Sequence, residues 1–429
     1  MKHRSLVTLT LAAAGATALA VSGTAPALAA SSPQTGGVYS VHPIVVKAGL
    51  PEVAVGPTLT PEQCLAQNNG RDACQTPQSI RAAYDIPATI DGVPAGTGQT
   101  IVIIDAFGSP TVQSDLATFS QAFGLPAADL SVIYPGGKPT WTGKGTQLDW
   151  AQETSLDVQW AHAVAPGAKI DLVVAANDHG ATIDNAEQYV ADQKLGNVLS
   201  MSYGEADNLI SSPTANNGQT SQARKAFAQA AAEGISLFAS SGDAGSDNGA
   251  GFANYSYPAS DPNVTSVGGT DLWVGSGLDQ PRETVWGDYA TCPLTCAFGV
   301  TGETGGAQSL FDTKAGSDVS YNAGVYTGVL TYLGFMGGAN NGFYYFGGTS
   351  AGSPQWAALT ADTIQAVGHP VGKVASYAAG WAASRVLHDV TVGSNTTATF
   401  GGGYSATAGW DQPTGWGTPD VGRIIAALQ

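Results

Sequence analysis

The segment TIVIID, residues Thr100–Asp105, is the first of five short apolar runs that decide the fold. Each run is rich in Val, Ile or Leu and is shorter than an ordinary helix, so each predicts a strand that is buried on both faces. The other four are KIDLVVA at Lys169–Ala175, VLSMSY at Val198–Tyr203, ISLFAS at Ile235–Ser240 and VTSVG at Val264–Gly268.

Amphipathic stretches separate these runs and predict helices at Val112–Phe123, Glu153–Ala163, Thr182–Gln193 and Ser221–Glu233. A strand followed by a helix, repeated at this spacing, predicts an α/β fold: a doubly wound, mainly parallel sheet with helices on both faces. In such sheets the residues that bind ligands or act in catalysis lie beyond the carboxyl ends of the strands.

The chain ends and its long middle region complete the predicted organisation. Residues 1–30 have the pattern of a secretory signal, with Lys2 and Arg4 before an apolar run and the small-residue pattern Ala27–Ala29. Residues 31–75 are rich in Pro and Gly and predict a lead-in or a residual pro-segment. We expect one catalytic domain over residues 76–429, with Gly-rich loops and a few strands at 273–346 and a helix at 350–367.

Composition narrows the classes of function. The formal net charge is −17, which makes nucleic acid and anionic membranes poor partners. No stretch after the signal approaches the roughly 20 apolar residues of a membrane span, so we expect a secreted, extracellular protein. Because the chain has only 16 Lys and Arg and 6 His, repulsion among its positive charges in acid stays limited. The four cysteines favour local disulfides, Cys64–Cys74 and Cys292–Cys296, among three possible connectivities.

The motif GGTSAGSP, Gly347–Pro354, is the sharpest chemical signal. It joins an aromatic strand to an apolar helix, so the hydroxyl of Ser350 lies at a helix start, where free backbone N–H groups can also hold an oxyanion. This setting suits a nucleophile, although a plain serine cap is the commoner use of such a residue.

A nucleophilic hydroxyl needs a base. Glu153 and Asp157 are four residues apart in QETSLDVQWAHAV, so on a helix they project from one face and can share a proton. Such a pair can keep one carboxylate ionised in acid, where an imidazole is protonated. A solvated helix face is the plain alternative. His162 and His179 are the nearest candidates for an imidazole base.

Three further aspartates follow strands or lie in turns. Asp243, just past ISLFAS, could donate a hydrogen bond to an oxyanion if it is protonated, although Gly-Asp is also an ordinary turn. Asp389 and Asp411 lie in Gly-rich loops whose oxygen atoms suit calcium, and turn formation is the alternative there. The candidate oxygens are the two carboxylates and the carbonyls of Val390, Thr407 and Gly409.

Taken together and in order, these segments resemble the sedolisins, serine-carboxyl peptidases with the subtilisin fold. The resemblance covers nearly all of the chain after Thr76 and runs through TPQSIRAAYDIP, GQTIVIIDAFGSP, ETSLDVQWAHAVAPGAKI, SSGDAGS, YPASDPNVTSVGGT, GGTSAGSPQWAAL, HDVTVG and AGWDQPTGWGTPD. Each motif is weak alone, but eight motifs in the family's order are specific.

The resemblance implies a secreted endopeptidase that hydrolyses peptide bonds in proteins through an acyl-enzyme, fastest in acid. Ser350 is then the nucleophile, Glu153 the general base and acid, Asp157 its carboxylate partner and Asp243 the oxyanion donor. The resemblance also implies one structural calcium ion at Asp389 and Asp411 with the three carbonyls named above. We expect a monomer acting on protein or peptide substrates.

The sequence departs from the family pattern before the domain, at Tyr203 and in the Gly-rich region after Trp286, which is shortened. Members usually carry a long folded propeptide, whereas only residues 31–75 lie between signal and domain here, which puts self-inhibited maturation in doubt. Tyr203 stands where many members have Trp, and this bears on substrate contacts. Two rival functions stay open: a histidine-dependent hydrolase using His162, and a binding protein, either a catalytically dead relative or a glycan binder using Trp410 and Trp416.

Overall fold

The computed structural model describes residues 38–41, 44–48, 59–67, 74–210, 219–273, 282–288, 302–397 and 401–429. Residues Thr35–Gln429 form one compact unit. The predicted signal at residues 1–30 and the predicted disulfide Cys292–Cys296 lie outside the described residues.

An eight-stranded sheet runs through this unit in the order β12-β11-β9-β7-β4-β6-β5, with β13 also paired to β11. All neighbouring strands are parallel except β12, which is antiparallel to β11. The predicted α/β class with a mainly parallel sheet is therefore confirmed. The strands are β4 (Thr100–Ala106), β5 (Asp129–Ile133), β6 (Lys169–Ala175), β7 (Val198–Met201), β9 (Ser236–Ser240), β11 (Thr265–Trp273), β12 (Arg282–Val285) and β13 (Val319–Asn322).

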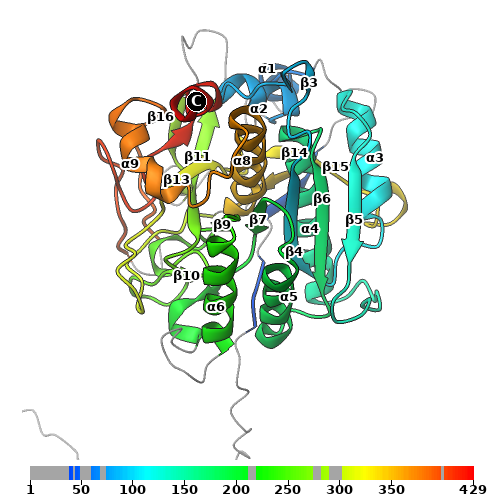
Figure 1. The fold of residues 1–429 in the computed structure, drawn as a ribbon, viewed down its shortest axis with the longest axis horizontal. Helices are drawn as coiled ribbons and strands as arrows, with labels where there is room; N and C mark the ends of the chain where they lie inside the picture. Colours follow the sequence, from blue (N-terminus) through cyan, green and yellow to red (C-terminus); the bar gives the residue numbers. More distant parts are fainter. Residues whose placement is uncertain are drawn as a thin grey trace, which may run out of the picture. The chain divides into compact units, whose positions relative to one another are not determined.

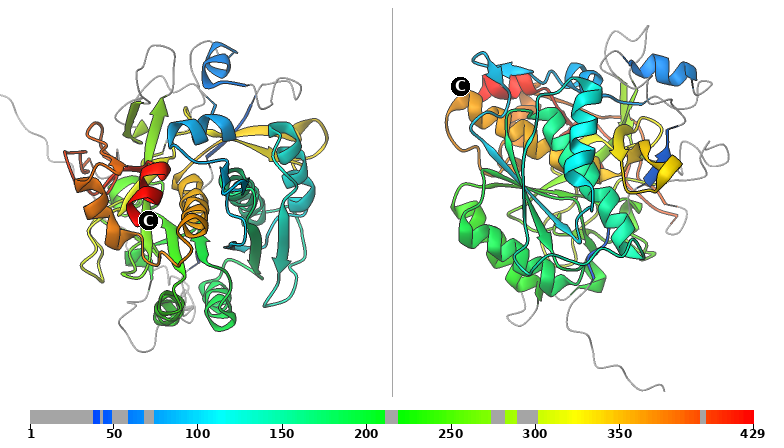
Figure 2. Two further views of the ribbon diagram at one scale, coloured as in Figure 1. Left: turned by 45° about the horizontal axis from the view of Figure 1, so that its top comes forward. Right: turned by 90° about the vertical axis from the view of Figure 1, so that its right-hand side faces the viewer.

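Helices cover both faces of the sheet (Figures 1 and 2). On one face α5 (Gly180–Gln193) and α6 (Gln219–Ala232) pack against each other and against β4, β6 and β9. On the other face α3 (Val112–Phe123), α4 (Thr146–Val164) and α8 (Gly352–Val367) pack together and against β4, β7, β9 and β11. The core is divided accordingly into two clusters of buried apolar side chains, one for each face.

Helix α4 is buried over most of its length. Every residue from Trp150 to Val164 is buried, because α3, α8, β4 and the strand β14 (Val329–Leu333) surround the helix. A helix with Glu153 and Asp157 in its middle is therefore not a solvated face. This rules out the plain alternative that the charge pattern of this segment left open.

Smaller elements finish the unit around this sheet. The short helices are α1 (Pro61–Gln67), α2 (Pro77–Ala83), α9 (Ala375–Ala383) and α10 (Val421–Leu428). The two-residue strands pair as β2 (Thr89–Ile90) with β3 (Val93–Pro94), β8 (Glu205–Ala206) with β10 (Ser256–Tyr257), and β16 (Leu387–His388) with β17 (Thr418–Pro419). Among the described residues, no helix is long and apolar enough to cross a membrane.

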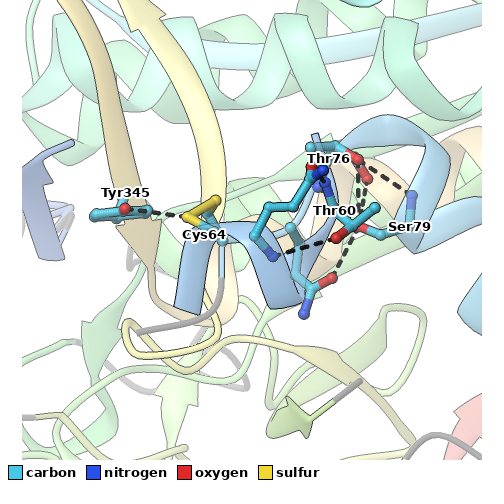
Figure 3. The surroundings of a disulfide bond; sticks show 8 residues. Thr60, Cys64, Thr76, Ser79 and Tyr345 are labelled. Atoms are coloured by element: carbon cyan, nitrogen blue, oxygen red, sulfur yellow. Dashed lines mark hydrogen bonds between the residues drawn. A yellow bond between two sulfur atoms is a disulfide. The ribbon is translucent and has the colours of Figure 1, made fainter. Parts of the chain in front are cut away.

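The segment expected to lead into the domain packs within the same compact unit. Its strand β1 (Ile44–Lys47) pairs with β15 (Gly342–Gly347), and β15 in turn pairs with β14. The predicted disulfide Cys64–Cys74 is present, and the sulfur of Cys64 lies 3.2 Å from the hydroxyl of Tyr345 on β15 (Figure 3). The domain boundary at residue 76 stays a prediction, but strand pairing continues across it.

Candidate active site

The sheet brings three polar positions to one edge. Strands β4, β7 and β9 are neighbours, and their carboxyl ends carry Asp105, Ser202 and Asp243 respectively. Ser350 lies above the same edge in the 3₁₀ turn Thr349–Ala351, directly before α8. The hydroxyl of Ser350 donates to the carbonyl of Ser202 at 3.3 Å, and the hydroxyl of Ser202 donates to the carbonyl of Ser350 at 3.2 Å.

Helix α4 adds two carboxyl groups to this edge. Glu153 and Asp157 lie one turn apart and are both 0% exposed. Burial raises the pKa of Glu153 well above its usual value, the nearby Asp105 raises it further, and the hydroxyl of Ser350 lowers it. By strict geometry neither carboxylate oxygen of Glu153 has a hydrogen-bond partner among the described residues, so its contact with Ser350 is looser than an ordinary hydrogen bond. Such catalytic contacts commonly tighten only when substrate binds.

Glu153 and Asp157 form a coupled pair of buried carboxyl groups. Burial raises the pKa of Asp157 well above its usual value, and the charges of Asp105 and Glu153 add to this. The contact between the two carboxyls raises the pKa of Asp157 but lowers that of Glu153. The pKa of both carboxyls is raised, so the pair can share one proton and titrates as a unit.

Asp105 is the member of this cluster that the sequence analysis did not single out. It is 0% exposed, and burial raises its pKa to about 7, against a lowering by Thr154 on α4. A polar residue near the carboxyl end of the run TIVIID was the available signal, because buried parallel strands rarely carry a carboxylate without a function. Three carboxyl groups thus share one buried space.

Asp243 is positioned by the turn that carries Ser350. Its Oδ1 accepts hydrogen bonds from the backbone N–H and the hydroxyl of Thr349, both at 2.7 Å. Its Oδ2 faces Gly348, where an added Cβ would lie 2.6 Å from this oxygen. Gly348 also has a φ of +116°, which strongly favours glycine. The turn can therefore approach Asp243 this closely only with glycine at position 348.

A cavity of about 240 Å³ opens at this edge and is lined by Ser350 and Asp243. The wall also includes Ser240 at the end of β9 and residues that follow β7 and β9, among them Ser202, Tyr203, Gly204, Glu205, Gly242 and Ala244. An acyl group attached to Ser350 would have room here, and a carboxyl group at Asp243 borders the same space. The arrangement can support nucleophilic attack with a carboxylate base.

The two candidate imidazole bases are placed elsewhere. His162 is buried on α4, and its Nε2 lies 2.9 Å from the carbonyl of Pro126. It is nine residues beyond Glu153, which is about 13 Å along a helix axis. Burial lowers the pKa of His162 to about 4. His179 is exposed at the start of α5. Neither residue lines the cavity that Ser350 borders.

The predicted calcium ligands lie together in a separate loop cluster. The Oδ2 of Asp389 accepts from the N–H of Gly409 at 2.9 Å, and the Oδ2 of Asp411 accepts from the N–H of Thr407 at 3.0 Å. The pKa of Asp411 is raised by burial, and the charge of Asp389 adds to this. No described residue donates a hydrogen bond to the carbonyls of Val390, Thr407 or Gly409. Two close carboxylates and free carbonyls form a donor set that fits calcium.

Comparison with known proteins bears on the family of the chain. The profile of the subtilase family matches residues 143–417. Kumamolisin from Bacillus sp. (strain MN-32) is 32% identical over 377 residues, and sedolisin from Pseudomonas sp. (strain 101) is 31% identical over 390 residues. Both alignments cover 82% of this chain. The chain spans 63% and 61% of the length of these two relatives.

A solved structure gives the same result for the fold. Pseudomonas sedolisin, described as a serine-carboxyl proteinase and solved with pseudo-iodotyrostatin, superposes with a TM-score of 0.69 at 27% identity. The superposition covers 84% of this chain and 99% of that one. Fervidolysin from Fervidobacterium pennivorans, at 17% identity and a TM-score of 0.51, supports the fold alone.

Proposed function

The chain belongs to the subtilase family and, within it, is related to the sedolisins. We propose that it is a secreted, acid-acting serine-carboxyl endopeptidase. The observation that carries the proposal is the placement of the Ser350 hydroxyl beside Glu153 in a buried cluster of carboxyl groups. Among the described residues no histidine lines the cavity that Ser350 borders, and the Nε2 of His162 lies 2.9 Å from the carbonyl of Pro126. The base is therefore a carboxylate.

The reaction begins when Glu153 takes the proton of Ser350 and the serine oxygen attacks the carbonyl carbon of the scissile bond. Asp243 borders the cavity beside Ser350 and, when protonated, donates a hydrogen bond to the oxyanion that forms. Glu153 then gives its proton to the leaving amine, and the acyl group stays on Ser350. Water attacks this ester in the reverse sequence of proton transfers and releases the second product.

Acid favours the oxyanion donor of this machinery, and Asp157 limits the charge beside the base. Asp243 must carry a proton to donate one, which a carboxyl group does at low pH. Asp157 keeps its proton over a wide range because burial and two neighbouring carboxyls raise its pKa. Glu153 can then ionise alone without placing two charges side by side.

We also propose that Asp389 and Asp411, with the carbonyls of Val390, Thr407 and Gly409, hold one structural calcium ion. The bound ion would supply positive charge between two close carboxylates and tie the loop after β16 to the loop before β17. The support is the fit of the donor set, in which Asp389 raises the pKa of Asp411. This loop cluster does not take part in the chemical steps above.

The positions of Trp410 and Trp416 do not support the alternative of a glycan-binding protein. The indole N–H of Trp410 donates to the carbonyl of Ser317 at 3.0 Å, and Trp416 packs against the main core. Both rings are half-buried and do not form an exposed stacking platform. A glycan binder would need both rings exposed, whereas Trp410 is tied to Ser317 and Trp416 to the core.

The proposal is tested by digestion of a denatured protein at pH 3–5, the range in which carboxyl groups titrate. We expect Ser350→Ala and Glu153→Gln each to abolish turnover. Ser376→Ala on α9 and Glu233→Gln, whose carboxylate pairs with Lys194 on the surface, are matched controls that should digest at the parent rate. Digestion by Ser350→Ala at the parent rate would refute the proposal.

A further inference from the structure

The main chain of Asp243 pairs with a second stretch of the protein, segment 303–306. The N–H of Glu303 donates to the carbonyl of Asp243 at 3.2 Å, and the N–H of Gly245 donates to the carbonyl of Glu303 at 3.0 Å. Two residues later in the same segment, a further N–H donates to the carbonyl of Gly242 at 2.7 Å. The turn before α8 fixes the carboxyl group of Asp243, whereas this pairing fixes its backbone.

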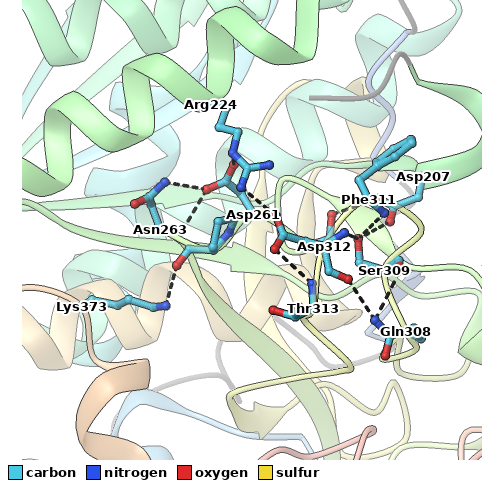
Figure 4. A network of polar contacts seen from close by, with 12 residues as sticks. Asp207, Arg224, Asp261, Asn263, Gln308, Ser309, Phe311, Asp312, Thr313 and Lys373 are labelled. Carbon is cyan, nitrogen blue, oxygen red and sulfur yellow. Dashed lines mark hydrogen bonds and ion pairs between the residues drawn. The ribbon is translucent and has the colours of Figure 1, made fainter. Parts of the chain in front are cut away.

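The chain that follows segment 303–306 is anchored by its own side chains. The hydroxyl of Ser309 donates to Oδ2 of Asp207 at 2.8 Å, and the guanidinium of Arg224 donates to Oδ2 of Asp312 at 2.6 Å (Figure 4). These anchors lie beyond the segment. The segment itself is held by a residue from a third part of the sequence.

Asn395 holds segment 303–306 through its side chain. Its Nδ2 donates to the carbonyls of Gly305 and Gly306 at 3.3 and 3.1 Å, and its Oδ1 accepts from the backbone N–H of Tyr404 at 2.9 Å. Asn395 is 0% exposed, so its amide is shielded from solvent. Removal of the amide would take this donor from two buried carbonyls, which is the costly way to lose a hydrogen bond.

The stretch that carries Asn395 also contacts the loop after β9 directly. The carbonyl of Asn395 accepts from the N–H of Ser246 at 3.3 Å, and the hydroxyl of Thr397 donates to Oδ1 of Asp247 at 3.1 Å. Gly245 has a φ of +69°, and a Cβ added there would collide with Cγ2 of Thr397. The loop can therefore pack against Thr397 this closely only with glycine at position 245.

The sequence around Asn395 has a second reading that the structure removes. Residues 395–397 have the Asn-x-Thr pattern of an N-glycosylation acceptor. In the folded chain the nitrogen that would carry the glycan is buried and makes two hydrogen bonds. Both polar residues of the pattern therefore have structural partners, which a glycan on Asn395 would displace.

Asn395 and Thr397 act on the reaction only through other residues. The described residues that line the cavity beside Ser350 include Asp243 but neither of these two. The carboxyl group of Asp243 has to point at the oxyanion, and a displacement of about 1 Å in such a group can cost about 10²-fold in rate. A residue that fixes the backbone of Asp243 therefore influences the rate without contacting substrate.

We propose that Asn395, supported by Thr397, is a positioning residue for Asp243. Its amide holds segment 303–306, and this segment holds the backbone from which the Asp243 carboxyl group reaches the oxyanion. This inference rests on the proposed function, because it gives Asp243 the role of oxyanion donor. The hold of Asn395 on the loop after β9 can be tested without turnover.

Hydrogen exchange measures this hold. Amide exchange is followed by mass spectrometry at pH 5 in full chains that all carry Ser350→Ala, so that no chain digests another. We expect Asn395→Ala to speed exchange about tenfold in peptides that cover residues 242–247 and 303–306, because their N–H groups open more often. Asn197→Ala is the matched control: this side chain accepts its hydrogen bond at the amino end of β4, so exchange in both peptides should stay within about twofold of the parent.

A double-mutant cycle measures the role in the reaction. With a peptide substrate at pH 4, we expect Asn395→Ala to lower kcat about tenfold and to change KM by less than about twofold, because no substrate contact is lost. In an Asp243→Ala background the same substitution should lower kcat by less than about twofold, since the group that it positions is already gone. Asn197→Ala should leave kcat within about twofold of the parent.

Thr397→Val is the milder variant, because it removes one hydroxyl and keeps the shape of the side chain. We expect it to speed exchange in peptide 242–247 and to lower kcat by about threefold, again only when Asp243 is present. The thermal transition of each variant shows whether it is folded. Thr397→Val decides the proposal if Asn395→Ala does not fold, and parent values of both exchange and kcat in Thr397→Val would then overturn it.

A folded Asn395→Ala chain with the parent's exchange in both peptides would overturn the hold on the loop. A tenfold loss of kcat that persists in the Asp243→Ala background would overturn the positioning role, because the effect would not pass through Asp243. A parent chain that digests no protein refutes the proposed function instead. The exchange comparison still decides in that case whether Asn395 holds the loop after β9.

Discussion

Asp243 owes its position to a single turn, because Thr349 holds one of its oxygens and Gly348 leaves room for the other. We predict that Asp243→Ala lowers kcat by about 10²- to 10³-fold, the usual effect of losing one oxyanion donor. Asp243→Asn should keep more activity, since an amide N–H₂ donates at every pH. Initial rates on a peptide substrate between pH 3 and pH 7 measure both effects.

The pH dependence of Asp243→Asn tests whether Asp243 acts in its protonated form. The parent should lose activity as pH rises and Asp243 gives up its proton, whereas Asp243→Asn should lose less over the same range. A parent and an asparagine variant with the same pH profile would show that the protonation of Asp243 does not limit the rate.

The sequence predicted the candidate site residues that lie in recognisable motifs. Ser350, Glu153, Asp157 and Asp243 were singled out by their motifs, and the structure brings all four to one edge of the sheet. Asp105 was missed because a carboxylate in an apolar strand has no spacing signal of its own. The environment of Trp410 and Trp416 was also beyond sequence reasoning, since half-burial of an aromatic depends on segments far away in the chain.

At the scale of elements, α4 is held at its C-terminal end by a side chain from α2. The guanidinium of Arg81 donates to the carbonyls of Ala163 and Val164 at 2.7 and 2.8 Å, and also to the carbonyl of Pro87. Carbonyls at a helix end otherwise lack partners, so this contact anchors the helix that carries Glu153. We predict that Arg81→Met lowers the free energy of unfolding by about 2–3 kcal/mol.

Urea unfolding measures this loss. Arg385→Met, at an exposed position after α9, is the control and should stay within about 0.5 kcal/mol of the parent. An Arg81→Met variant with the midpoint of the parent would show that α4 needs no anchor from α2.

The loop cluster around Asp389 and Asp411 gives a second prediction at this scale. If calcium binds there, a chelator should lower the Tm, because the bound ion stabilises only the folded chain. Asp411→Asn should have a Tm close to that of the chelated parent and should respond little to chelation. Thermal unfolding with and without chelator measures the effect independently of activity. A parent Tm that chelator leaves unchanged would contradict the calcium site.

Element positions were predictable where hydrophobic patterning is strong. The helix expected at Val112–Phe123 and the strand expected at Lys169–Ala175 have the predicted bounds. The helix expected at Glu153–Ala163 begins earlier, at Thr146, because its first turns carry polar residues that hid the pattern. The aromatic strand before Ser350 was predicted and is β15, but the edge strand β5 and the pairing of β15 with β1 and β14 were not, since strand pairing is not a local property.

At the scale of the whole molecule, buried carboxyl groups dominate the dependence of stability on pH. Burial raises the pKa to about 6 in Asp288, about 7 in Asp105, about 8 in Glu187 and about 9 in Asp184. The unfolded chain loses these protons near pH 4, whereas the folded chain keeps them, so rising pH favours unfolding. We predict that the Tm is highest near pH 4 and falls steadily toward pH 8.

One group works in the opposite direction. Burial lowers the pKa of His162 to about 4, so its contribution to stability is lost as pH falls from about 6.5. Four carboxyl groups outweigh one imidazole, and the net slope between pH 4 and pH 8 should stay negative. Glu187→Gln should flatten this slope. A Tm that rises over this interval would contradict the assigned protonation states.

The rate at which Ser350 becomes acylated reports directly on the group that acts as its base. Intact-mass spectrometry after mixing with a peptide ester at pH 3–7 follows the acyl-enzyme without waiting for its hydrolysis. We predict an adduct on Ser350 already at pH 3–5 that forms at least about 100-fold more slowly in Glu153→Gln. Acylation of Glu153→Gln at the parent rate would contradict a carboxylate base. So would a parent rate that rises only through roughly pH 6–7, where a histidine imidazolium loses its proton.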